Sequence, residues 1–357
     1  MNFELNEFMR LYTTLFFFLI FPQIISAQIG GDNVYEFINL PISARVSALG
    51  GNLITVKDDD NALAYGNPAA LNPLMHKQVT FNSAFYAAEI NYGFLGYGFH
   101  LDKLETTFNA GLQYITYGDF TAADETGLQT GEFGAAEYVF NVGAGRQYSE
   151  QISYGINLKT IYSRLESYNS LGVAADAAVM YADTAANFTA TMVFKNFGTQ
   201  LSTYVDGNRE DMPFEVQAGV SKRLRYLPLR FSIIAHNLQR WNIRYDDPNQ
   251  VEPTSLFDDT PQEENRFAVM TDNFFRHFIF NGELLVGKAD NFRIRLGYNH
   301  LRRAELNVNN LRSLAGFSTG LGIKVSKFRI DYGLAVYHLA GTVHHFGIST
   351  NINSFIR

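Results

Sequence analysis

Several things that this sequence lacks narrow the class of protein. It has no cysteine among its 357 residues, which excludes disulfides and thiolate metal sites. Beyond residue 27 it has no run of about 20 consecutive apolar residues, and its mean hydropathy is only −0.09, which excludes a helical membrane protein. Lys and Arg number 28 against 35 Asp and Glu, and the net charge of −7 excludes a general nucleic-acid footprint.

Aromatic residues and glycine are plentiful, and apolar residues recur with a period of two. The chain has 31 Phe and 20 Tyr but one Trp, a composition suited to interfacial girdles and a lipid-facing wall. Ile156 and Leu158, for example, alternate with Asn157 and Lys159. Fourteen stretches with this pattern are predicted as strands: 77–86, 89–101, 105–118, 133–147, 150–164, 172–182, 187–195, 213–224, 228–237, 275–288, 291–301, 312–325, 327–339 and 342–352.

The connections between these strands alternate in length. One set is only about one to four residues long, which suits tight turns. The other set includes the long connections 119–132, 196–212 and 238–274. Short turns on one side and long loops on the other predict an all-β membrane protein, an antiparallel transmembrane β-barrel of about 14 strands over residues 77–357. A soluble β-sandwich alternates in the same way within its strands, but it has no reason to keep its long connections at one end.

Two segments precede the barrel. Residues 1–27 are predicted to be a signal peptide, with an apolar core from Leu11 to Ile25 and a small-residue cleavage point; the true start, Met1 or Met9, stays open. Export followed by barrel strands predicts the bacterial outer membrane, with the long loops extracellular. Residues 28–76 are not strand-like and predict a hatch folded into the lumen, where irregular backbone is tolerated.

The hatch also carries a resemblance to a known family. It resembles the start of the mature chain in PorQ-like outer-membrane barrels of the type IX secretion system, within the wider PorV/FadL-like barrel group. The residues that carry this resemblance are Tyr35-Glu36-Phe37-Ile38-Asn39-Leu40-Pro41, then Ser43-Ala44-Arg45 and Ala48-Leu49-Gly50-Gly51, then Asn67-Pro68-Ala69-Ala70-Leu71. The wider group is similarly fourteen-stranded with an N-terminal hatch.

The resemblance implies a non-enzymatic anchor in the secretion and attachment complex. Such a barrel would dock a surface-exposed protein of the PorZ type, in company with a PorV-like barrel and a sortase, close to outer-membrane lipid and lipopolysaccharide. A FadL-like importer of hydrophobic small molecules and a PorV-like shuttle that binds secreted cargo stay open as alternatives. Neither a nucleophile elbow, a zinc-helix motif nor a phosphate loop occurs, so no catalytic residues and no cofactor are predicted.

The loop 238–274 is the leading candidate for a docking surface. It holds seven acids and no Lys or Arg between Asp246 and Glu264, and the only tryptophan of the chain lies just before them. Tryptophan and arginine are common interface anchors, and an acidic loop suits a basic partner. Ca²⁺ or Mg²⁺ bound against lipopolysaccharide phosphates, or a solvated loop without a ligand, are the alternatives. The predicted partner-binding residues are Arg240, Trp241, Arg244, Asp246, Asp247, Asp258, Asp259, Glu263 and Glu264.

Charged residues of both signs fall at positions predicted to face the lumen. Counting across the turn near residue 289 places Glu283 beside Arg295, and we predict that they form a salt bridge. The acidic run 58–60 is predicted to form a solvent-facing turn or hatch-to-wall salt bridges in preference to a calcium site. The adjacent His344 and His345 are predicted to face opposite sides of a strand, which makes a metal site there improbable.

Overall fold

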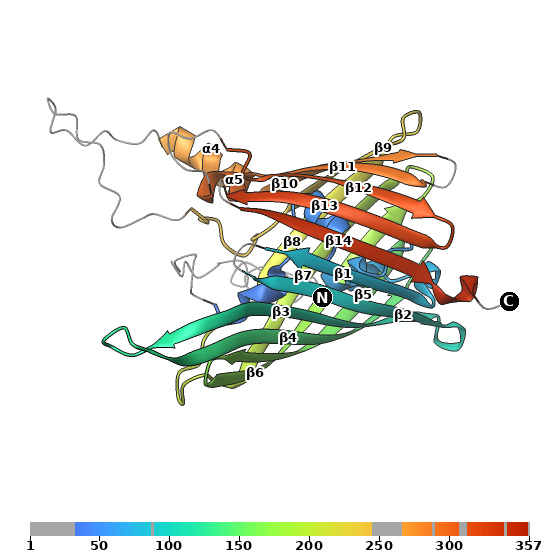
Figure 1. Cartoon of the computed structure of the whole chain (residues 1–357). Helices are drawn as coiled ribbons and strands as arrows, with labels where there is room; N and C mark the ends of the chain where they lie inside the picture. The colour runs from blue at the N-terminus through green and yellow to red at the C-terminus, as the bar shows by residue number, and fades with distance from the viewer. Residues whose placement is uncertain are drawn as a thin grey trace, which may run out of the picture. The chain divides into compact units, whose positions relative to one another are not determined.

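The structure, a computed structural model, is described here over residues 33–86, 89–244, 266–287, 290–306, 313–338 and 341–355. In this part of the chain fourteen antiparallel strands form a closed barrel, in which each strand pairs with its neighbours in sequence and β1 pairs with β14 (Figure 1). The strands are β1 (Gln78–Phe85), β2 (Asn91–Leu101), β3 (Thr106–Ala123), β4 (Gln129–Gln147), β5 (Ile152–Leu165), β6 (Tyr168–Asp183), β7 (Phe188–Ser202), β8 (Glu215–Arg223), β9 (Leu229–Ala235), β10 (Phe278–Val286), β11 (Phe292–Asn299), β12 (Phe317–Val325), β13 (Phe328–His338) and β14 (Gly341–Asn351).

The wall has an apolar outer face and a polar inner face. On β5, Ile156 and Leu158 are 53% and 59% exposed, whereas Asn157 and Lys159 between them are buried. Successive side chains of a strand point to opposite faces, so this alternation places the apolar row outward, as contact with lipid requires. Closure of the sheet leaves no unpaired strand edge. The predicted fourteen-stranded barrel is therefore confirmed.

Two of the predicted long loops are shorter than expected. Within 119–132, β3 continues to Ala123 and β4 begins at Gln129, so the connection is a tight turn capping a long hairpin. Ladder pairing and the stacked rings of Phe120 and Phe133, 5.2 Å apart, extend these strands. Within 196–212, β7 continues to Ser202 across an irregular pairing with β6. The composition of both stretches predicted loops. The strands nevertheless continue through parts of them, because strands can stay paired beyond the lipid.

The third long connection, 238–274, is described only in part. It ends in a helix, α4 (Arg266–Arg276), and a single residue separates this helix from β10. The last two residues of α4 belong to the stretch 275–288, which the sequence pattern predicted to be a strand. A second helix, α5 (His300–Glu305), follows β11, and short 3₁₀ turns occur at η4 (Asp102–Leu104) and η5 (Ile352–Ser354). None of the helices in the described part of the chain is long and apolar enough to cross a membrane.

Residues 33–76 form no strand, and we call them the luminal segment because their contacts are with the inner face of the wall. Its elements are η1 (Glu36–Asn39), α2 (Ala44–Ala48), α3 (Leu63–Gly66), η2 (Pro68–Ala70) and η3 (Pro73–Met75). Residues 28–32 of the predicted hatch and the predicted signal peptide, 1–27, lie outside the described residues.

Local sequence explains where the short helices of the luminal segment begin and end. The Ser43 hydroxyl accepts a hydrogen bond from the Val46 amide at 3.2 Å and caps α2. After α2, Gly50 and Gly51 adopt φ of 83° and 90°, a left-handed conformation that favours glycine. The helix therefore lies between the Ser43 cap and the glycine pair. Asn67 caps η2 in the same way, with its side chain accepting from the Ala69 amide at 2.9 Å.

Candidate functional site

Inward-facing glycines let the luminal segment lie directly against the wall. A Cβ atom added to Gly297 would meet the backbone of Leu49 and Gly50, and one added to Gly155 would meet the backbone of Pro68. At Gly333 the obstructing atoms belong to the backbone of Ala44. Any side chain at these positions would push the segment away from the wall.

Arg45 is the centre of the polar contact between the luminal segment and the wall. It is 1% exposed and its guanidinium forms ion pairs with Asp58 at 2.8 Å, with Asp60 at 3.1 Å and with Glu283 of β10 at 3.0 Å. Burial of a charge is tolerated when it is paired and hydrogen-bonded in this way.

The wall contributes further charges that complete this arrangement. Glu283 also pairs with Arg295 at 2.9 Å and with Arg230 at 3.0 Å, and Arg295 pairs with Asp331 at 2.5 Å. The structure thus brings together Glu283 and Arg295, which face each other across β10 and β11. We call the whole set the Arg45 network: Arg45, Asp58, Asp60, Arg230, Glu283, Arg295 and Asp331.

The electrostatics of the luminal segment agree with this pairing. Burial alone would raise the pKa of Asp58, but the Arg45 guanidinium outweighs it and holds the pKa well below its usual range. Burial raises the pKa of Asp60, against the opposing effect of Arg45. Burial opposes the charge on Arg45 too, but Asp58 and Glu283 raise its pKa above the ordinary value. The three segment charges therefore depend on one another.

Two other polar contacts tie the segment and the wall together. Asp59 pairs with Arg329 of β13 through two hydrogen bonds of 2.9 and 3.1 Å. Lys159 of β5 pairs with Asp176 of β6 at 2.8 Å and lies over the Tyr65 ring of the segment at 4.6 Å. The run 58–60 therefore forms segment-to-wall salt bridges. Among the described residues, no group of three or more His, Asp or Glu side chains has the arrangement of a metal site.

The residues that carry the family resemblance lie at these contacts. The Tyr35 hydroxyl hydrogen bonds to Ser170 of β6, and the Phe37 carbonyl accepts from Gln113 of β3 at 2.9 Å. The Asn67 side chain donates to the Ile54 carbonyl at 2.6 Å. Pro41 and Pro68 are buried. With Arg45, these residues hold the segment in place.

The two adjacent histidines face opposite sides of β14, as predicted. His345 is buried and its ring lies 2.9 Å from the Tyr92 hydroxyl, whereas His344 is exposed on the outer face beside Tyr332. A third histidine, His236, lies just past the end of β9 and is also buried, with Asn237 2.9 Å from its ring.

The predicted partner-binding residues lie partly outside the described chain. Asp246, Asp247, Asp258, Asp259, Glu263 and Glu264 fall in 245–265 and are not described, while Arg240, Trp241 and Arg244 precede that stretch. Trp241 is 62% exposed and stacks on the His277 ring at 5.7 Å. Its carbonyl accepts from the Asn273 side chain at 2.6 Å and lies 3.0 Å from His277 Nε2. Backbone contacts thus hold the Trp241 side chain at the barrel mouth.

Sequence reasoning missed the apolar surface of α4. Phe267, Met270 and Phe274 are spaced i, i+3 and i+7, and all three are exposed. That spacing is a helical signal and could have identified the helix. The rings of Phe274 and Trp241 lie 6.4 Å apart, so α4 extends the exposed aromatic surface that begins at Trp241.

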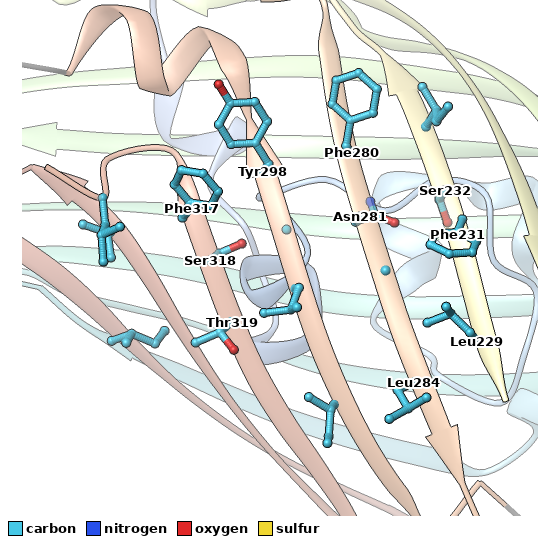
Figure 2. A pocket seen from close by; sticks show the side chains of 18 residues that line it. Leu229, Phe231, Ser232, Phe280, Asn281, Leu284, Tyr298, Phe317, Ser318 and Thr319 are labelled. Carbon is cyan, nitrogen blue, oxygen red and sulfur yellow. The ribbon is translucent and has the colours of Figure 1, made fainter. Parts of the chain in front are cut away.

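A groove on the outer face of the wall was also missed. It has a volume of about 1040 Å³ and is formed by outward-facing residues of β9 to β13, among them Phe231, Phe280, Tyr298 and Phe317 (Figure 2). We call it the outer-wall groove. No sequence signal marks it, because it depends on which outward side chains become neighbours across five strands.

Comparison with known proteins gives structural similarity alone. No family model matches the sequence, and no curated protein matches it. The toluene transporter TbuX of Ralstonia pickettii is 10% identical with a TM-score of 0.52, over 88% of this chain and 99% of the transporter. The toluene transporter TodX of Pseudomonas putida is 11% identical with a TM-score of 0.50, over 87% of this chain and 96% of the transporter. This chain therefore has the same fold as these two transporters.

Proposed function

We propose that this chain is a non-enzymatic outer-membrane scaffold that docks a surface-exposed protein through its loop end. The observation that carries the proposal is the Arg45 network, which joins the luminal segment to β9, β10, β11 and β13. Charges of both signs neutralise one another there, an arrangement that suits a fixed plug better than an ion-selective channel. The function of such a barrel then belongs to its loops.

The loop end supports this proposal through its exposed anchors. Trp241 and α4 present exposed aromatic side chains, and in the sequence they flank the acidic stretch 246–264. Aromatic anchors beside charged residues are typical of protein interfaces. The N-terminal resemblance favours a partner of the PorZ type in a type IX secretion complex, with a PorV-like barrel and a sortase nearby.

Import of hydrophobic small molecules is the second candidate function. The similarity in fold to two toluene transporters favours it over the scaffold, although identity of 10% and 11% carries the fold and not the substrate. Many unrelated activities can share one fold, so the luminal contacts of this chain weigh more in our proposal than the neighbours do.

Purification of the tagged protein from its own outer membrane in mild detergent tests the scaffold. We expect a water-soluble surface protein in a stoichiometric amount, and we expect deletion of 246–264 to abolish its recovery. The matched control replaces 125–127, the tip of the β3–β4 hairpin, and should leave recovery unchanged. Recovery of the barrel alone from both wild type and control would refute the scaffold.

Uptake measurements test the importer separately. Cells that lack the gene and cells that carry it are compared for uptake of radiolabelled toluene and oleate. If the protein is a scaffold, cells with and without the gene should take up toluene and oleate equally at all concentrations. Uptake that depends on the gene, together with a retained apolar molecule in the purified barrel, would establish import.

A further inference from the structure

The outer-wall groove is a hollow in the lipid-facing side of the wall. Its floor is Gly282 of β10, which faces outward between Phe280 and Leu284. A Cβ atom added to Gly282 would have no atom within 4 Å. The missing side chain therefore leaves open space where the neighbouring outward positions carry Phe231 and Leu296.

The lining of the groove suits an uncharged, apolar occupant. None of the described residues that line it is charged. Of its polar members, Ser232, Asn281 and Ser318 are buried on the luminal side of their strands. Thr319 faces outward (Figure 2), and its hydroxyl donates to the Arg295 carbonyl at 3.1 Å. Apart from Thr319, the surface offered to the outside is made of aliphatic and aromatic side chains, which attract hydrocarbon through burial of apolar area.

The groove follows its strands over a length comparable with the thickness of one leaflet of a membrane. Along β10 it extends from Phe280 to Leu284, which is about 14 Å at the usual rise of a strand. The apolar band of an outer-membrane barrel is about 25 Å tall. On β12 and β13 the lining reaches Phe317 and Val336 near the loop end, and on β9 it continues to Leu229, the first residue of that strand, near the opposite end.

Aromatic rings connect the groove with the loop end. The Phe280 and Phe278 rings stack at 6.2 Å, Phe278 and Phe274 lie 4.9 Å apart, and Phe274 contacts Trp241. Tyr298, at the same end of the groove, has its hydroxyl 2.8 Å from the His300 ring. Tryptophan and tyrosine at such positions mark the membrane interface, where the polar part of a lipid would lie.

We propose that the outer-wall groove binds the acyl chains of one membrane lipid as a retained ligand. The groove faces the bilayer, so lipid is the molecule always present at its entrance. Its hollow shape gives an acyl chain contacts on several sides, whereas a flat or convex part of a wall gives contacts on one. A lipid in the groove should therefore exchange more slowly than lipid elsewhere on the barrel.

Filling the groove tests the proposal. Gly282→Phe places a ring in the open space, and Ala177→Phe, on the outward face of β6, is the matched control. After extensive detergent washing, native mass spectrometry should find about one lipid per barrel in wild type and control, and at least a tenfold lower fraction in Gly282→Phe. Equal lipid retention in the two variants would overturn the proposal, as would a retained hydrocarbon or second protein in place of lipid.

A second measurement keeps the proposal testable if Gly282→Phe does not fold. In a Trp241→Phe background, Phe280→Trp places a single fluorophore in the groove, and Leu158→Trp places one on the convex wall of β5. In vesicles of phosphatidylcholine with brominated acyl chains, the groove reporter should be quenched at a lower mole fraction of brominated lipid. Identical quenching curves for the two reporters would refute the proposal.

Discussion

At the scale of single residues, two glycines on paired strands have opposite surroundings. Gly297 of β11 faces the lumen, where the backbone of the luminal segment touches it, whereas Gly282 of β10 faces outward into open space. The same residue type thus serves close packing on one side of the wall and leaves a hollow on the other. Composition alone could not distinguish these roles.

The first prediction follows from this contrast. Gly297→Val should displace the luminal segment, because the added side chain overlaps the backbone of Leu49 and Gly50; overpacking of this kind costs about 1–3 kcal/mol. Limited proteolysis of the folded barrel should then cleave within 33–76. Gly282→Val is the control and should stay resistant. Equal resistance of the two variants would show that the segment is not held at Gly297.

A second prediction concerns pH and rests on His236. Burial lowers its pKa from 6.5 to about 4. Because the folded-state pKa lies below the unfolded value, the stabilisation is complete above pH 6.5 and is lost as the pH falls towards 4. The shift corresponds to about 3 kcal/mol. Hydrogen exchange of the amides near His236 should therefore accelerate over this pH range.

Substitution tests the assignment to this residue. His236→Gln should flatten the pH dependence, because glutamine does not titrate. His344→Gln, which changes the exposed histidine of β14, should leave the dependence as in wild type. An unchanged pH profile in His236→Gln would assign the effect to another group.

At the scale of elements, the junction between α4 and the segment after β9 depends on the buried side-chain amide of Asn273. The Asn273 side chain donates to the Trp241 carbonyl at 2.6 Å and accepts from the Ile243 amide at 3.1 Å. These bonds fix a stretch without regular structure, so they decide where Trp241 is presented.

The third prediction removes that amide. Asn273→Ala should release residues 241–243, since loss of a buried hydrogen-bond partner costs about 1–3 kcal/mol per unsatisfied group. The fluorescence anisotropy of Trp241, the only tryptophan, should fall. Asp272→Ala, which removes the ion pairs to Arg276 and His300 and spares the loop bonds, serves as control. Equal anisotropy in all three proteins would contradict this account.

Strands and helices were not equally predictable from sequence. The fourteen strands were predictable because apolar residues recur at every second position. A barrel wall needs this alternation, since one of its faces contacts lipid and the other contacts the lumen. The ends of β3, β4 and β7 did not follow, because pairing beyond the lipid leaves little mark in composition. α4 was partly assigned to a strand, since its aromatic residues at 274, 275 and 278 also suit a sheet.

At the scale of the whole molecule, the Arg45 network joins the luminal segment to the inner face of the barrel. Arg45 carries three of its ion pairs, with Asp58, Asp60 and Glu283. Removal of one partner from a buried ion pair costs about 3–5 kcal/mol, because the remaining charges lose their neutralisation. The luminal segment is the mobile partner in that event, since the wall is closed by its own ladder hydrogen bonds.

The fourth prediction follows. In planar bilayers, wild type should be nearly non-conducting. Arg45→Met should loosen the luminal segment and thereby raise the single-channel conductance. Arg225→Met, in an exposed turn, is the control and should behave as wild type. Conductance that is high in wild type and unchanged by Arg45→Met would refute closure by this network.

The sequence by itself determined the barrel, the number of its strands and the inward charges, because alternation along a strand is a local property that any membrane wall imposes. It also placed Glu283 opposite Arg295, since register across a short turn can be counted. Only the tertiary structure decided that Arg45 joins them, that Gly282 opens a groove and that Trp241 stacks on His277. These contacts join residues from distant parts of the chain, and their partners are chosen by the packing of the luminal segment and the curvature of the closed wall.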